Sequence, residues 1–125
     1  CSAGRFGGVV YASSGGAVSI IESTVTGCSA GTFGGAIHTK SHPDGAFESA
    51  YLIVTDSTIS GCNANRGGAV YLESTSTWNS DLIVTDSTIS GCNATRGGAV
   101  YVDSGSSASL ARSNISNCSA TESGG

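Results

Sequence analysis

The sequence predicts an all-β fold, a right-handed parallel β-helix with three short strands per coil, and three observations lead to this prediction. Residues 82–101 repeat residues 52–71 with a single difference, Asn65 in one copy and Thr95 in the other. The cysteines recur at intervals of 27, 34, 30 and 26 residues, a period typical of stacked repeats. Within each repeat, β-branched residues alternate with small polar ones at a period of two, which indicates strands.

Looser copies of this unit fill the rest of the chain. Each copy carries one cysteine followed by a glycine pair, and the cysteines are Cys1, Cys28, Cys62, Cys92 and Cys118. The repeat predicts about four to five coils within a single segment, residues 1–125. Because the chain starts and stops in mid-repeat, we expect this segment to be a fragment of a longer array.

Each predicted strand supplies aliphatic columns to a shared, thin core. The first strand follows the glycine pair, and its inward columns are Val10, Ile37, Val70 and Val100, and Ala12, Thr39, Leu72 and Val102. The second strand contributes Val18, Leu52, Leu82 and Ala108, and Ile20, Val54, Val84 and Leu110. The third strand contributes Val25, Ile59, Ile89 and Ile115. Such a core stabilises a stack of coils better than one coil alone.

Alternation on the first strand predicts an outward aromatic column, with neighbours about 4.8 Å apart. Its members are Tyr11, His38, Tyr71 and Tyr101. Length varies between repeats only at the corner after this strand, where insertions carry Phe47, Tyr51 and Trp78. We expect the column and this insertion corner to form the interaction surface, since exposed aromatics often anchor protein or glycan interfaces. The alternative is that the insertions fold down over a strand and bury their own aromatics.

Composition narrows the class of partner. The chain is 6% aromatic, has 19 glycines, and carries a formal charge of −4 with only five Lys and Arg. Too few cations are present to neutralise phosphates, so we expect no nucleic-acid partner. No run of about 18 apolar residues and no signal peptide is present, so we expect no direct membrane insertion in this segment.

The motif GGAIHT, with its copies GGAVYL and GGAVYV, resembles the GGA[IVL] repeat of chlamydial polymorphic outer-membrane proteins and of similar microbial surface proteins. The resemblance covers essentially the whole chain. It implies a right-handed parallel β-helix of the pectate-lyase-like superfamily that acts as an extracellular passenger, adhesin or fibre segment. The second family motif, Phe-x-x-Asn, is altered here, because aliphatics replace Phe and Cys replaces Asn, as in Ile59-Ser60-Gly61-Cys62.

The cysteine column has three interpretations. Stacked Cα atoms about 4.8 Å apart fall within the Cα range of disulfides, so all five cysteines are disulfide candidates between successive coils. Alternatively, the thiols pack as small hydrophobic groups. A metal site is the weakest interpretation, because a linear file of thiolates lacks C-x-x-C spacing.

Polar residues recur at two further places. Glu22, Asp56 and Asp86 occupy equivalent corners, with Arg112 in the fourth copy, and an Asx turn explains them more simply than calcium. Three sequons make Asn93, Asn114 and Asn117 glycosylation candidates, and a predicted corner position makes Asn93 the best acceptor. Arg66 and Arg96 are interpreted as solvated corner residues.

The functional hypothesis is a non-enzymatic structural or adhesive module at the cell surface or in an extracellular filament, with no cofactor. Its partners would be other protomers, further repeats, glycans or another surface protein. Ice binding is one alternative, because Thr24-x-Thr26, Thr58-x-Ser60, Thr88-x-Ser90 and Asn114-x-Ser116 form an outward hydroxyl grid. A carbohydrate-active β-helix is another, although His38 and His42 are interpreted as surface residues rather than general bases and lack clustered carboxylates.

Overall fold

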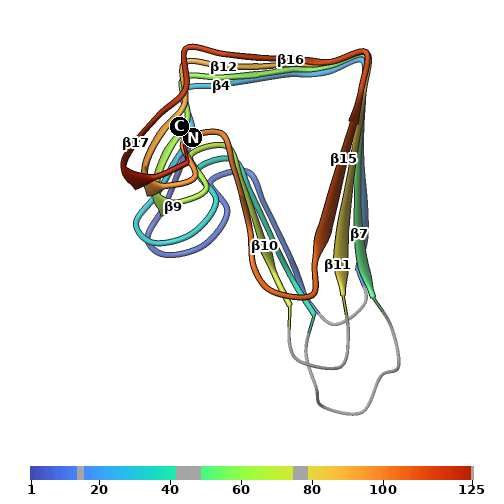
Figure 1. Cartoon of the computed structure of the whole chain (residues 1–125), viewed down its shortest axis with the longest axis horizontal. Coiled ribbons are helices and arrows are strands. Elements are labelled where there is room, and N and C mark those ends of the chain that lie inside the picture. Colours follow the sequence, from blue (N-terminus) through green and yellow to red (C-terminus); the bar gives the residue numbers. More distant parts are fainter. Residues whose placement is uncertain (14–15, 42–48, 75–78, 125) are drawn as a thin grey trace.

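The chain forms an all-β parallel solenoid of about four turns, as the sequence predicts (Figure 1). The computed structural model describes residues 1–13, 16–41, 49–74 and 79–124. Seen along the stack in Figure 1, the strands of successive turns lie over one another and outline three long sides and a lobe. None of the described residues forms a helix, and therefore none of them offers a helix able to cross a membrane.

Strands from successive turns pair in parallel to form four sheets, named here A to D in the order in which each turn visits them. Sheet A contains β1 (Ser2–Ala3), β5 (Ser29–Ala30), β9 (Asn63–Arg66), β13 (Asn93–Arg96) and β17 (Ser119–Ser123). Sheet B contains β2 (Val10–Ser13), β6 (Ile37–Lys40), β10 (Val70–Glu73) and β14 (Val100–Val102). Sheet C contains β3 (Ala17–Ile21), β7 (Ala50–Thr55), β11 (Ser80–Thr85) and β15 (Ser107–Ala111). Sheet D contains β4 (Thr24–Thr26), β8 (Thr58–Ser60), β12 (Thr88–Ser90) and β16 (Asn114–Ser116).

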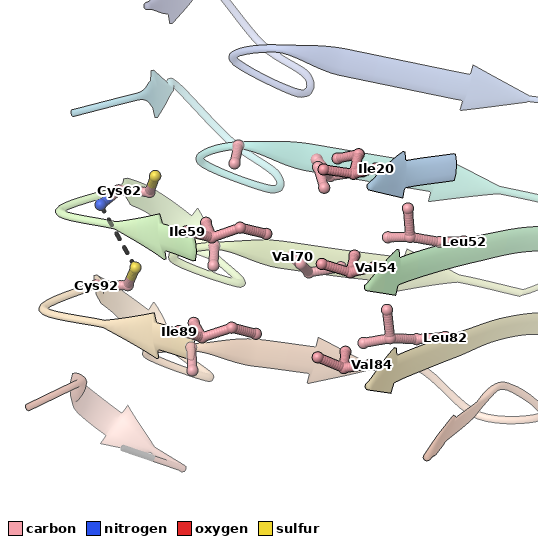
Figure 2. Close-up of a cluster of buried hydrophobic side chains, with 14 of the residues drawn as sticks. Ile20, Leu52, Val54, Ile59, Cys62, Val70, Leu82, Val84, Ile89 and Cys92 are labelled. Carbon is pink, nitrogen blue, oxygen red and sulfur yellow. Dashed lines mark hydrogen bonds between the residues drawn. The ribbon is translucent and has the colours of Figure 1, made fainter. Parts of the chain in front are cut away.

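The predicted aliphatic columns are confirmed residue by residue. Leu82 pairs with Leu52 on one side and with Ala108 on the other, and Ile59 pairs with Val25 and Ile89. Side chains of the central turns point into the space between sheets B, C and D, and are at most 1% exposed (Figure 2). The core is therefore a stack of small aliphatic layers shared by neighbouring turns.

The prediction of three strands per turn is wrong, because sheet A supplies a fourth. Its strands are short and polar, so they lack the aliphatic alternation that marked the other three. A weaker signal was present, since every cysteine is followed two residues later by an alanine. These alanines stack in sheet A, where Ala30 and Ala94 are 7% and 8% exposed.

The glycine pair makes the tight bend from sheet A into sheet B. Gly67 has a φ of +64°, and a Cβ there would lie 2.2 Å from the carbonyl oxygen of Val70. A Cβ on Gly68 would lie 2.0 Å from the carbonyl oxygen of Gly98 in the next turn. Gly67 therefore meets a conformational requirement, whereas Gly68 allows two turns to approach closely.

A ladder of serine hydroxyls, rather than an Asx turn, stabilises the corner between sheets C and D. The hydroxyl of Ser57 donates to the carbonyl of Thr55 at 2.7 Å, and its oxygen accepts from the backbone N–H of Ser23 at 3.0 Å. Ser87 repeats both contacts, with Thr85 and with the N–H of Ser57. The predicted Asx turn at Asp56 is wrong, because the backbone N–H groups of Ser57 and Thr58 donate to Ser87 and Ser23 of neighbouring turns, and Asp56 adopts a left-handed φ of 49°.

We expect replacement of Gly68 by alanine to destabilise the solenoid by about 3 kcal/mol or more, because the new methyl group would overlap backbone of the adjacent turn. The matched control is Gly61→Ala. Gly61 has a similar φ of +61°, but its Cβ would meet nothing nearer than 3.8 Å. The control should cost only about 1–2 kcal/mol from the left-handed backbone. Urea unfolding measures both, and equal losses would contradict the close-approach explanation.

Candidate functional site

The aromatic column predicted on sheet B is present and in register. Tyr71 pairs with His38 on one side and Tyr101 on the other, and His38 pairs with Tyr11. Neighbouring ring centroids lie 5.0 Å apart between Tyr11 and His38, 5.0 Å between His38 and Tyr71, and 5.3 Å between Tyr71 and Tyr101. All four side chains lie on the opposite face of the strands from the aliphatic core.

A second row of rings covers part of this column. Phe6 and Phe33 come from the chain between sheet A and the glycine pair, and they stack on one another with centroids 5.7 Å apart. Phe33 stacks on Tyr71 at 4.7 Å and lies 5.5 Å from His38, while Phe6 lies 5.3 Å from Tyr11. In Figure 1 the sheet A lobe lies beside the outer side of sheet B, which brings the second row into contact with the first. The guanidinium of Arg66 lies 5.6 Å from the Phe33 ring, so Arg66 packs on an aromatic.

The expectation of a continuous exposed aromatic strip is therefore wrong. His38 is 0% and Tyr71 2% exposed, because Phe33 covers them, and only Tyr11, at 46%, is well exposed. Tyr101 is half-buried. His38 is likewise not the surface residue predicted. His42, Phe47 and Trp78 lie outside the described residues.

Carboxylates of the next turn lie within hydrogen-bond distance of the polar atoms of His38 and Tyr71. The Nε2 atom of His38 lies 3.1 Å from Oε2 of Glu73, whose other oxygen accepts from Nζ of Lys40 at 2.8 Å. The hydroxyl of Tyr71 donates to Oδ2 of Asp103 at 3.3 Å, which repeats the same geometry one turn later. Nδ1 of His38 has no hydrogen-bond partner among the described residues. The contacts with Glu73 and Asp103 fix the orientation of the His38 and Tyr71 rings.

Burial controls the protonation of these groups. It lowers the pKa of His38 from 6.5 to about 4, against the opposing effect of Glu73. Burial also raises the pKa of Tyr71 to about 12. His38 is therefore neutral at neutral pH and enclosed by rings, an arrangement suited to packing.

The cysteine column is present, but all five cysteines are free thiols, so the bridges predicted between turns are not formed. The thiols of Cys28, Cys62 and Cys92 are buried, and each donates to the carbonyl two residues earlier at 3.3 to 3.4 Å. The backbone N–H of Cys62 donates to Sγ of Cys92 at 3.5 Å (Figure 2).

Parallel, in-register pairing explains why bridges do not form. Side chains at one register position point the same way, so their Cβ atoms stay roughly 4.8 Å apart like the strands. A disulfide needs Cβ atoms about 3.5–4.5 Å apart, and the Cα spacing used for the prediction did not include this requirement. Burial raises the pKa of the Cys28 thiol, and the neighbouring Cys62 side chain, together with burial, raises that of Cys92. The buried thiols pack as small hydrophobic groups.

The remaining polar candidates occupy corners and sheet A. Glu22, Asp56, Asp86 and Arg112 share a left-handed φ of 46° to 49°, and Arg112 makes two 2.7 Å hydrogen bonds to Asp86. No group of three or more metal-ligating side chains gathers within the described part of the chain. Arg96 pairs with Glu122 at 2.7 Å.

The predicted ranking of the sequons needs correction. Asn93 lies within β13 rather than at a corner, and its amide nitrogen donates to Oδ1 of Asn63 at 3.2 Å. Asn114 lies within β16, whereas Asn117 occupies an exposed corner with a φ of 52°. The corner acceptor is therefore Asn117.

Sequence reasoning missed an exposed apolar patch on the outer face of sheet C. Ile53 and Ile83 are register partners there and are 39% and 43% exposed. Tyr51, predicted as a contact residue of the insertion corner, lies instead within β7 on the same face and is 46% exposed, and Ile21 of β3 is 55% exposed. Strand alternation could have revealed these residues, because each follows or precedes a buried core residue.

No protein-family model, no curated protein and no solved structure matches this chain.

We expect acid to destabilise the protein through His38. The unfolded chain protonates this histidine near pH 6.5, whereas the folded chain does so only near pH 4. Stability should therefore fall as pH drops through this window, by about 3 kcal/mol in total, since one pKa unit corresponds to about 1.4 kcal/mol. Urea unfolding at a series of pH values measures the loss.

The matched variant is His38→Tyr, which introduces the residue found at the equivalent positions 11, 71 and 101. The new hydroxyl can donate to Glu73 as Tyr71 donates to Asp103. Both proteins carry the same carboxylates. The difference between the two curves of stability against pH therefore reports the histidine. Identical pH dependence from pH 6.5 to 4 would contradict the burial of His38.

Alkylation should separate the cysteines by burial. Without reductant, the folded protein should be modified first at exposed Cys1 and then at half-buried Cys118. The other three thiols should react only at the rate of unfolding, because they are fully buried. Intact mass spectrometry with and without reductant provides the measurement. A reductant-dependent change in mass would show a disulfide and contradict the thiol column.

Proposed function

We propose that this chain is a non-enzymatic structural or adhesive module of an extracellular surface protein or filament, and that it acts by lateral contact. The main support is the ordering of uncharged side chains on the outer faces of sheets C and D. Their outward rows run along the stack in register, as in Thr58, Thr88 and Asn114. Asp81 is the one charged residue in these rows.

Charged side chains gather instead on sheets A and B and at the corners. Lys40 and Glu73 lie on sheet B, Arg96 and Glu122 on sheet A, and Asp86 and Arg112 at the corner between sheets C and D. Two faces with so little charge are suited to packing against another surface, because Asp81 is the one charge on them that the contact would have to desolvate or pair. The buried aromatic column no longer supports contact through sheet B.

The extracellular setting rests on the sequence motif. The GGA[IVL] repeat resembles that of polymorphic outer-membrane proteins, which implies a surface passenger, and partners would be other protomers, further repeats or surface glycans. The glycines of this motif form a tight bend between stacked turns, and any solenoid with that bend would need glycine there.

The test is to place charge on both neutral faces of the intact native protein. The double variant Ile53→Asp, Thr88→Asp should lose attachment or lateral assembly, as seen by electron microscopy of the native material. The control is the double variant Asn63→Asp, Asn65→Asp, which adds the same two negative charges on sheet A and keeps an oxygen at position 63 to accept from Asn93. A monomeric native protein without attachment, or a double variant that behaves like the control, would refute the proposal.

Ice binding is a second candidate, favoured by the hydroxyl rows of sheet D. Thr24, Thr58 and Thr88 form one in-register row, and Thr26, Ser60 and Ser90 form the next. Rows spaced by the strand repeat of about 4.8 Å could order water, although serine removes methyl groups from the second row. Thermal hysteresis that Thr58→Tyr abolishes would support this function. Absence of thermal hysteresis in the unmodified protein would refute ice binding.

A further inference from the structure

The outer face of sheet C carries three rows of side chains along the stack. Tyr51 pairs with Asp81, Ile53 with Ile83, and Thr55 with Thr85. Ile21 of β3 joins the last row beside Thr55. An aromatic ring, a carboxylate, aliphatic groups and hydroxyls therefore share one face, which we name the Tyr51 face.

The carboxylate on this face is held in position. Oδ1 of Asp81 accepts a hydrogen bond from the hydroxyl of Ser107 in the next turn at 2.6 Å. Asp81 is half-buried beside Tyr51, which is 46% exposed. A fixed carboxylate is a strong acceptor for hydroxyl donors, because charge-assisted hydrogen bonds are shorter and stronger than neutral ones.

The charge pattern limits what can occupy the face. No Lys or Arg lies in its rows, and the corner beside it carries Asp56 and an Asp86 that is already paired with Arg112. An acidic polymer would meet uncompensated negative charge, and the chain as a whole carries −4. A neutral ligand with hydroxyl donors fits this pattern.

The area of the face argues against a second copy of the chain as the occupant. Four apolar side chains are exposed there, each by between 39% and 55%. A stable protein interface needs about 800 Å² from each partner and is depleted of charge at its centre, whereas the apolar side chains here are few and lie beside the Asp81 carboxylate. A narrow, extended ligand that follows the rows needs less area.

We propose that the Tyr51 face binds a neutral, extended polysaccharide. The Tyr51 ring packs against the C–H face of a sugar, and the Asp81 carboxylate accepts hydrogen bonds from its hydroxyls. Ile53 and Ile83 extend the apolar contact along the stack, while Thr55 and Thr85 hydrogen-bond at the edge. This inference rests on the proposed function and names the partner of one of its two faces.

Affinity electrophoresis tests the inference with hydroxyethyl cellulose, xylan and galactomannan as neutral polymers and polygalacturonate as the acidic one. We expect retardation by at least one neutral polymer, little dependence on salt, and no retardation by polygalacturonate. Tyr51→Ala should weaken binding by about tenfold, since a stacked aromatic anchor contributes about 1.4 kcal/mol. Asp81→Asn should weaken it several-fold.

The matched control is Tyr11→Ala, which removes a tyrosine that is also 46% exposed but lies on sheet B. The control should bind like the unmodified protein, and circular dichroism should show that every variant is folded. Failure of all three neutral polymers, equal losses in the two tyrosine variants, or a dimer that depends on Tyr51 would overturn the inference. If the polymers fail while charge on sheets C and D still abolishes native attachment, the proposed function stands without this ligand.

Discussion

The structure depends on in-register parallel stacking at the bend between sheets A and B. Each turn must pass within contact distance of the next, and Gly8, Gly35, Gly68 and Gly98 permit this, because a Cβ on any of them would fall 2.0 to 2.3 Å from a carbonyl oxygen. Once this spacing is fixed, equivalent residues of successive turns lie over one another. Residues of the same kind at one repeat position therefore form a continuous column along the stack. Aliphatic, thiol, serine hydroxyl and aromatic columns all follow from this one constraint.

Stacking also decides which columns remain accessible. Sheet A lies beside the outer side of sheet B, and Phe33 covers His38 and Tyr71. The rings that look most suited to recognition therefore stabilise the fold, and their polar tips are held by Glu73 and Asp103. The proposed contact therefore lies on sheets C and D, whose outer faces are uncovered among the described residues and almost uncharged.

Strand alternation predicted the fold class, the three aliphatic strands and their core columns, but not the buried column of Ala36, Ala69 and Ala99 that follows the glycine pairs. It could not predict sheet A, whose strands carry alanine and polar residues and are identified by pairing alone. It predicted that His38 and Tyr71 point away from the core, but not that Phe33, on another strand segment, covers them. The disulfide prediction was wrong because spacing along a column does not include the direction of the side chains. Tyr51 was predicted as a contact residue, but Ile53 and Ile83 beside it were missed because they look like core residues in the sequence.

The central claim is that sheet A covers the outer face of sheet B. It is tested most directly by nuclear Overhauser effects between aromatic rings in the protein in solution. The ring of Phe33 should show effects to both Tyr71 and His38, whose centroids lie 4.7 and 5.5 Å away, while the Tyr71 ring shows none to water. A Tyr71 ring in contact with water, with no effect from Phe33, would contradict the account.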